Sequence, residues 1–170
     1  MYRRFFKSLL CLIIGLTALA LTGCGKTYYT QVNLMKMNDY YAGLFTERLH
    51  RFNVDVIQEQ QQIIIILPNK IFNMDSVNFS TTGPIVLDEV GNLLRYYKME
   101  VVKVEGVLPL AQRGEKEAKA LAAGRAQSVI DYLWGQKVDI SLAYALGKLR
   151  SEMVNNKLPS EYVAISFRRI

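Results

Sequence analysis

The run Leu21-Thr22-Gly23-Cys24 could support covalent chemistry, because its cysteine follows small residues at the end of an apolar segment. Arg3, Arg4 and Lys7 place positive charge before that segment, and Leu9 to Leu21 carries no charge. A basic start, an apolar middle and a small-residue end are the pattern of a secretory signal peptide. The sequence therefore predicts a signal peptide over 1–23 that is cleaved before Cys24.

The same run resembles the lipobox of bacterial lipoproteins. The resemblance implies that Cys24 becomes the first residue of the mature chain and carries several acyl chains, each buried methylene adding about 0.8 kcal/mol of membrane affinity. A retained transmembrane anchor is the alternative, but the apolar run is shorter than the roughly 20 residues that span a bilayer core. Because Gly25 is not the aspartate that favours inner-membrane retention in this family, we expect an outer-membrane location with the domain facing the periplasm.

Charge and cysteine content narrow the remaining function classes. Residues 1–23 hold three basic and no acidic residues, so their removal lowers the formal net charge from +6 to +3. The remaining charges are interspersed, whereas nucleic-acid binders show a basic patch or stripe, so we expect no nucleic-acid partner. Cys11 would leave with the signal peptide, which leaves no cysteine to form a disulfide with Cys24. A packed core of one domain must stabilise the chain.

Other residues with reactive side chains do not form a recognisable catalytic or metal-binding motif. Gly25-Lys26-Thr27 mimics the end of a phosphate-binding loop, but the glycine needed five positions earlier is Ala20. His50 is the only histidine and has no ligand partner for a metal, so it is expected on the surface. Ser128 and Asp131 lack a histidine base for a hydrolase triad. We therefore expect no enzyme activity, catalytic residue, metal site or cofactor.

Hydrophobic periodicity predicts the elements that follow a spacer over 24–38. Three helices are expected, each with an apolar stripe: 39–52, Pro84 to Tyr97, and Arg113 to Trp134 ended by Gly135. Five strands are expected: Asn53 to Ile57, Gln61 to Leu67, Glu100 to Leu108, Ile140 to Leu146, and Val163 to Phe167. The run Gly147 to Ser160 is expected to be a polar loop. This alternation predicts an α+β fold, a two-layer α/β sandwich whose helices pack on one face of a mixed sheet.

The segment Leu121 to Leu133 resembles the OmpA-like C-terminal domain family, which carries a leucine, a small residue and then Arg-Ala at the start of such a helix. The order and spacing of further segments agree over 53–170, which implies the family's βαβαββ arrangement. These further segments are Ile71-Phe72 with Asp75-Ser76, Val104-Glu105-Gly106, Tyr144-Ala145-Leu146-Gly147 and Val163-Ala164-Ile165.

The resemblance implies a non-covalent peptidoglycan site in which an arginine and an aspartate grip the carboxylate and ammonium of a diaminopimelate side chain. Arg125 matches the arginine, and a guanidinium can hold a carboxylate through two parallel hydrogen bonds. The aspartate is missing, because Pro109 stands at its position and Leu108 precedes it. Ser160-Glu161-Tyr162 also departs from the asparagine and arginines common in the family.

Two acidic side chains, Glu105 and Glu115, are candidates to replace the missing carboxylate, although their spacing does not favour either. Alternatively, Arg125 lays its stem on the core and its charged head in water. We therefore expect one of two functions. The first is a peptidoglycan-binding lipoprotein that anchors the outer membrane to the cell wall. The second is a docking component of an envelope secretion complex with other envelope proteins as partners, since the chain also resembles the DotK/IcmN lipoprotein family of type IVB secretion systems.

Overall fold

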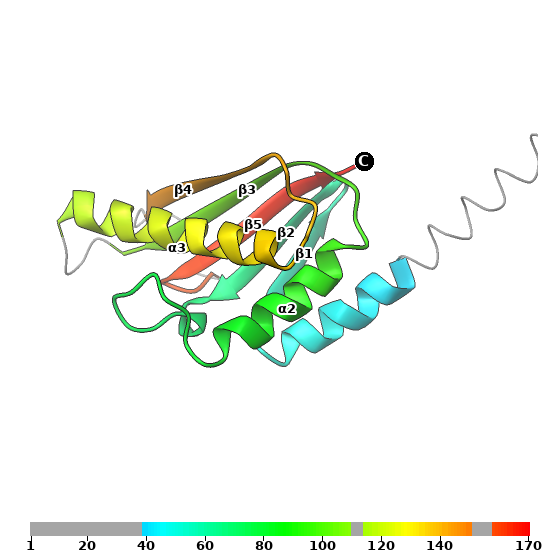
Figure 1. The fold of residues 1–170 in the computed structure, drawn as a ribbon, viewed down its shortest axis with the longest axis horizontal. Helices are drawn as coiled ribbons and strands as arrows, with labels where there is room; N and C mark the ends of the chain where they lie inside the picture. Colours follow the sequence, from blue (N-terminus) through cyan, green and yellow to red (C-terminus); the bar gives the residue numbers. More distant parts are fainter. Residues whose placement is uncertain (1–38, 110–113, 151–157) are drawn as a thin grey trace, which may run out of the picture. The chain divides into compact units, whose positions relative to one another are not determined.

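The computed structural model describes residues 39–109, 114–150 and 158–170. The expected signal peptide over 1–23, Cys24 and the spacer over 24–38 lie outside these ranges. The chain divides into two units, Met1–Tyr40 and Tyr41–Ile170. Asp39 and Tyr40, the described residues of the first unit, are helical. The second unit has an α+β fold (Figure 1).

Residues 41–50 form a helix in the second unit, two residues shorter at its end than the sequence predicts. Leu49 is fully buried in the core, and the Tyr41 ring stacks on Tyr96 at 5.6 Å between ring centres. The helix ends in a Schellman motif, in which the Val54 amide donates to the Leu49 carbonyl and Asn53 has a φ of 57°. This turn leads directly into the first strand.

A hairpin of β1 (Asp55–Glu59) and β2 (Gln62–Pro68) follows, with Asp55 paired to Ile66 and Glu59 to Gln62. The unbroken isoleucine run of β2 predicts a strand buried on both faces, and most of its side chains are buried. Only Ile64 in that run is half-buried. β2 therefore lies in the interior of the sheet, with β1 outside it.

The sheet contains five strands among the described residues, in the order β1-β2-β5-β3-β4. The later strands are β3 (Met99–Leu108), β4 (Ala143–Leu149) and β5 (Tyr162–Arg169). β3 and β4 are parallel, whereas the other neighbours are antiparallel, so the sheet is mixed as predicted. The final strand in the sequence is the middle strand of the sheet.

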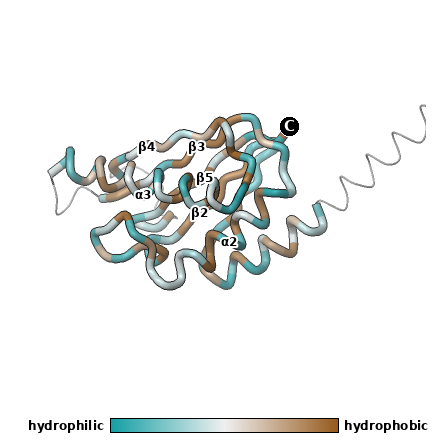
Figure 2. The backbone as a smooth tube through the Cα atoms, viewed as in Figure 1, coloured by the Kyte–Doolittle hydropathy of each residue, from teal (hydrophilic) through white to brown (hydrophobic). Residues whose placement is uncertain are grey.

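The helices α2 (Gly83–Leu94) and α3 (Glu115–Gly135) cover one face of the sheet, as Figure 1 shows. Hydrophobic residues follow α2 and the strands in Figure 2. α3 lies very close to β3 and β4 because Gly106 and Gly147 are paired side by side beneath it. A Cβ atom at Gly106 would lie 2.0 Å from the Ala122 carbonyl oxygen, so no larger residue fits there without moving the helix.

The predicted bounds of β4 were wrong. β4 begins at Ala143 rather than Ile140, because Ile140 is buried in the helix–strand connection, where its carbonyl accepts a hydrogen bond from the Trp134 ring. The strand consequently runs through Gly147 to Leu149, which the sequence assigns to a loop. α3 ends at Gly135 as predicted, but Gly135 does not take the left-handed conformation that closes the helix end. That role belongs to Lys137, whose φ is 57°.

Candidate functional site around Arg125

The central turns of α3 present Arg125 to a loop over 72–79 that leaves the end of β2. A short 3-10 helix, η1 (Asn69–Ile71), starts the connection, and Phe72 pairs with Phe79 across the base of the loop. The loop rests directly on α3, because a Cβ at Gly124 would lie only 2.7 Å from the Val77 side chain. Because Gly124 has no side chain, the loop can approach α3 closely enough to reach Arg125.

The Arg125 side chain is buried, with 3% of its surface exposed, and each nitrogen of its guanidinium has a partner in the chain. Nε donates to the Ser76 carbonyl at 2.9 Å, and Nη2 donates to the Asn73 carbonyl at 3.4 Å. Nη1 donates to the side-chain oxygen of Asn69, and the guanidinium lies 5.2 Å from the centre of the Phe72 ring. The alternative in which the head of Arg125 lies in water was therefore wrong.

Glu161 supplies the carboxylate that approaches this guanidinium. Its Oε2 lies 3.6 Å from Nη1 of Arg125, and its side chain is about one-third exposed. Glu161 immediately precedes β5, where the sequence departs from the arginine-rich pattern of OmpA-like domains. That departure was the one sequence feature that pointed to Glu161. Only the position of β5 beside β2 shows that Glu161 faces Arg125.

Glu105, one of the two acidic candidates from the sequence, is held by two lysines. Lys103 Nζ lies 2.9 Å from Oε2 of Glu105, and Lys148 Nζ contacts Oε1. Burial raises the pKa of the Glu105 carboxyl, but hydrogen bonds and charge from Lys148 and Lys103 outweigh that effect and hold the pKa below 4.5. Glu105 is therefore engaged in its own charged cluster.

Glu115, the other candidate, lies in the first turn of α3 and is fully exposed. Lys119 donates to its carboxylate at 2.6 Å, which lowers the pKa of Glu115. This pair follows the i,i+4 spacing that places side chains together on a helix surface. Pro109 follows β3 and is partly buried, and it has no side-chain acceptor for an ammonium.

The remaining sequence candidates do not assemble a reactive site in the described part of the chain. His50 is exposed as predicted, and its Nδ1 lies 4.0 Å from an Asp55 oxygen. Ser128 donates to the Gly124 carbonyl, and Asp131 accepts from Gln127 within α3. The described residues contain no group of three histidine, cysteine or acidic side chains that could hold a metal ion. They also contain no helix that is long and apolar enough to cross a membrane.

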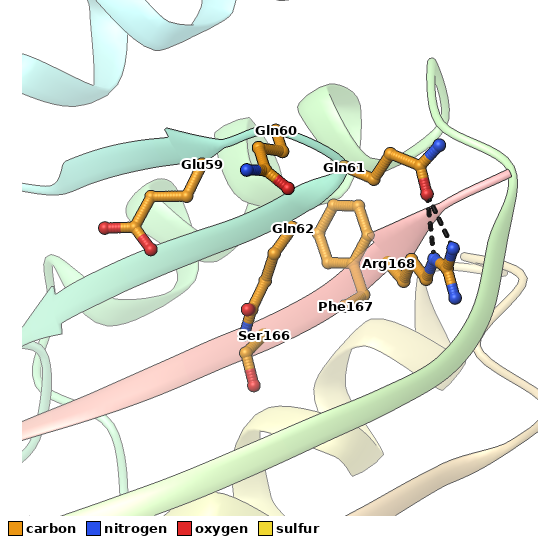
Figure 3. A pocket seen from close by; sticks show the side chains of 7 residues that line it. All are labelled: Glu59, Gln60, Gln61, Gln62, Ser166, Phe167 and Arg168. Atoms are coloured by element: carbon orange, nitrogen blue, oxygen red, sulfur yellow. Dashed lines mark hydrogen bonds between the residues drawn. The ribbon is translucent and has the colours of Figure 1, made fainter.

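A hollow of about 720 Å³ lies at the β1–β2 turn, and neither Arg125 nor its partners line it (Figure 3). Its lining is polar, with Glu59 to Gln62 on one side and Ser166 to Arg168 on the other. The Arg168 guanidinium donates two hydrogen bonds to the side-chain oxygen of Gln61, at 2.8 and 2.9 Å. The polar side chains that line this hollow therefore come mostly from the turn of the β1–β2 hairpin.

Comparison with solved structures identifies the arrangement of these elements. The cell wall anchor of the T6SS from Pseudomonas aeruginosa superposes with a TM-score of 0.64 at 18% identity, over 76% of this chain and 97% of the anchor. A MotB-like protein from Desulfovibrio vulgaris gives a TM-score of 0.62 at 13% identity, over 83% of this chain and 99% of that protein. The chain has the OmpA-like fold.

An OmpA-like domain from Francisella tularensis matches more distantly, with a TM-score of 0.52 at 17% identity over 69% of this chain and 82% of that domain. No protein-family model and no curated protein sequence matches the chain. Sequence identities this low show the shared fold alone.

Proposed function

We propose that this protein is an outer-membrane lipoprotein whose OmpA-like domain is a non-enzymatic docking component of a cell-envelope secretion complex. The observation that carries this proposal is the closed state of the Arg125 site. The guanidinium that would grip a ligand carboxylate is already bound by loop carbonyls, Asn69 and Glu161. The domain thus keeps the fold but uses this arginine to hold itself together.

A ligand would have to compete with the groups that already bind Arg125. A ligand carboxylate could reach Arg125 only by displacing Glu161 or the carbonyls of Asn73 and Ser76. Buried acceptors left without a donor cost about 1–3 kcal/mol each, which would consume much of the affinity of a small ligand. The ammonium of such a ligand would also lack its partner, because Pro109 replaces the aspartate of the family pattern.

The lipid anchor is supported by the sequence before the domain. The basic start, the apolar run and the small residues before Cys24 favour export and lipid attachment, and Gly25 favours the outer membrane. Resemblance to the DotK/IcmN lipoproteins favours a type IVB secretion complex as the place of docking. The segment Tyr28–Met37 is rich in apolar and aromatic residues, which protein interfaces favour.

Sedimentation with isolated peptidoglycan tests the closed site. The purified full chain should remain in the supernatant. A triple variant, Leu108→Thr, Pro109→Asp and Glu161→Gln, should sediment more strongly, because it frees Arg125 from the competing carboxylate and restores an acidic partner. Arg168→Ala serves as the control for charge, since this exposed arginine lies outside the Arg125 site. Sedimentation of the parent chain that free diaminopimelate abolishes would contradict the proposal.

Co-purification from membranes tests docking itself. The parent chain should recover envelope proteins, and deletion of Tyr28–Met37 with Cys24 retained should reduce that recovery while the domain stays folded. Equal recovery by both chains would count against docking through this segment.

Cell-wall anchoring is the second candidate function. Arg125 occupies the position of the family arginine, and one structural neighbour is described as a cell wall anchor. Strong sedimentation of the parent chain, together with its loss in a folded Arg125→Lys variant, would replace the docking proposal with this one.

A further inference from the structure

A small pocket of about 220 Å³ lies on the face of the sheet opposite α3. Gly106 and Gly147 face α3, and side chains alternate between the faces of a strand. Val107 and Lys148, the next residues in β3 and β4, therefore project to the helix-free face. Both line the pocket, and Arg150 lines it directly after β4.

The charges around this pocket do not balance. Glu105 is one carboxylate shared by two ammonium groups, those of Lys103 and Lys148. Arg150 donates Nη1 to the Pro159 carbonyl and has no acidic partner among the residues that the structure describes. Among the described residues that line the pocket, the two cations Lys148 and Arg150 thus outnumber the single carboxylate of Glu105, which Lys103 also helps to neutralise.

The remaining walls of the pocket are largely apolar. Val107 and Ala164 are each 7% exposed and form part of the lining, together with Leu149 and Leu158. Tyr162 adds an aromatic ring and a hydroxyl group at the same site. An apolar pocket with a few convergent polar groups is the usual form of a small-ligand site, and this one is smaller than most.

We propose that this pocket binds a carboxylate carried by a small apolar group, as found at the free C-terminus of a peptide chain. The carboxylate lies between Lys148 and Arg150, and the adjoining aliphatic side chain contacts Val107 and Ala164. A charged hydrogen bond to either cation is stronger than a neutral one, and the guanidinium fork matches a carboxylate. The site is separate from Arg125 and does not depend on the proposed docking function.

Fluorescence polarisation with a labelled Gly-Gly-Ala-Val peptide tests the proposal on the purified full chain. The peptide with a free carboxylate should bind at least about tenfold more tightly than its C-terminal amide, a difference of about 1.4 kcal/mol. Methyl NMR signals of Val107 and Ala164 should shift on binding. Equal affinity for acid and amide, or unchanged methyl signals, would overturn the proposal.

Variants that remove positive charge test which cations bind the peptide carboxylate. Lys148→Gln with Arg150→Gln should weaken binding by about tenfold or more, whereas the charge-matched pair Lys116→Gln with Lys137→Gln should not. The single substitution Lys148→Gln should disturb the packing of the domain less, since this side chain is 56% exposed. An equal loss in the control pair would show a general charge effect and reject the site. Equally effective competition by inorganic phosphate would reject the specificity for a carboxylate.

Discussion

Arg125 fixes the loop over 72–79 to α3, and this role predicts a stability effect. Arg125→Ala should lower the free energy of unfolding by about 3 kcal/mol, because it removes a buried charge partner and leaves buried acceptors without donors. Arg125→Lys should recover only part of this loss, since an ammonium cannot reproduce the planar fork. Urea unfolding followed by circular dichroism measures the difference.

Arg168→Ala is the matched control for this experiment. Arg168 also donates two hydrogen bonds, but it is exposed, so its loss should cost less than about 1 kcal/mol. Similar losses for Arg125→Ala and Arg168→Ala would show that Arg125 does not hold the loop.

Glu105 predicts a specific dependence of stability on pH. Since its folded-state pKa lies below 4.5, the carboxylate stabilises the fold above about pH 4.5 and loses this contribution as the pH falls through the lowered pKa. Glu105→Gln should therefore be less stable than the parent at pH 7, and the gap should narrow below pH 4.5. Unfolding curves at several pH values measure it, and a gap that stays constant would exclude the charge effect.

The sequence predicted the position of Arg125 but not its partners. The spacing in α3 identifies Arg125 without knowledge of the tertiary structure, because a helix motif is local. Glu161 lies far along the chain, and its approach depends on the insertion of β5 beside β2. Asn69 and the carbonyls of Asn73 and Ser76 belong to the connection after β2, and hydrophobic periodicity does not predict the conformation of such a loop. Backbone acceptors carry no sequence signal at all.

The C-terminal end of α3 offers a position where a substitution should increase the stability of the domain. The Val138 amide donates to the Leu133 carbonyl and the Lys137 amide to the Trp134 carbonyl, which is a Schellman motif. Lys137 occupies the left-handed position that glycine favours. Lys137→Gly should therefore stabilise the domain by about 1 kcal/mol, measured as a higher midpoint of thermal unfolding.

Gln136→Gly is the control, because Gln136 has a φ of −81° and gains nothing from a glycine. This neighbouring change should leave the domain unchanged or less stable. If both substitutions shift the midpoint in the same direction, the left-handed strain at Lys137 is not the cause.

Local pattern predicted most elements well, and the failures have a physical reason. β2, β3 and α3 begin and end within two residues of their predicted bounds, wherever the structure describes the residue concerned. Each of them contains a long, regular pattern of apolar residues. β4 differs by three residues at its start. The alternating run around Ile140 and Leu142 is typical of a strand, yet Ile140 is buried in the connection from α3, and pairing with β3 starts only at Ala143.

The proposed membrane attachment concerns the whole molecule, and it would depend on Cys24, which lies outside the described ranges. Cys24→Ser should leave an unprocessed chain without lipid, because no other residue at the predicted cleavage site can take a thioether. Metabolic labelling with palmitate and fractionation of membranes measure this change. A Cys24→Ser chain that is still cleaved and still sediments with outer membranes would contradict the lipoprotein assignment.

The central place of β5 also determines when this domain can fold. β5 pairs with β2 on one side and with β3 on the other, so the second neighbour of Gln62 in the sheet, after Glu59 of the hairpin, is the distant Arg168. Contacts between segments so distant in the sequence slow folding, because closing long loops costs entropy before the strands can pair. Until residues 162–169 arrive, β2 and β3 each present an open edge that can pair with another chain. If the proposed signal peptide directs export from the N-terminus, the sheet would be completed only after nearly all of the chain has crossed the membrane, so the chain would stay unfolded during the crossing.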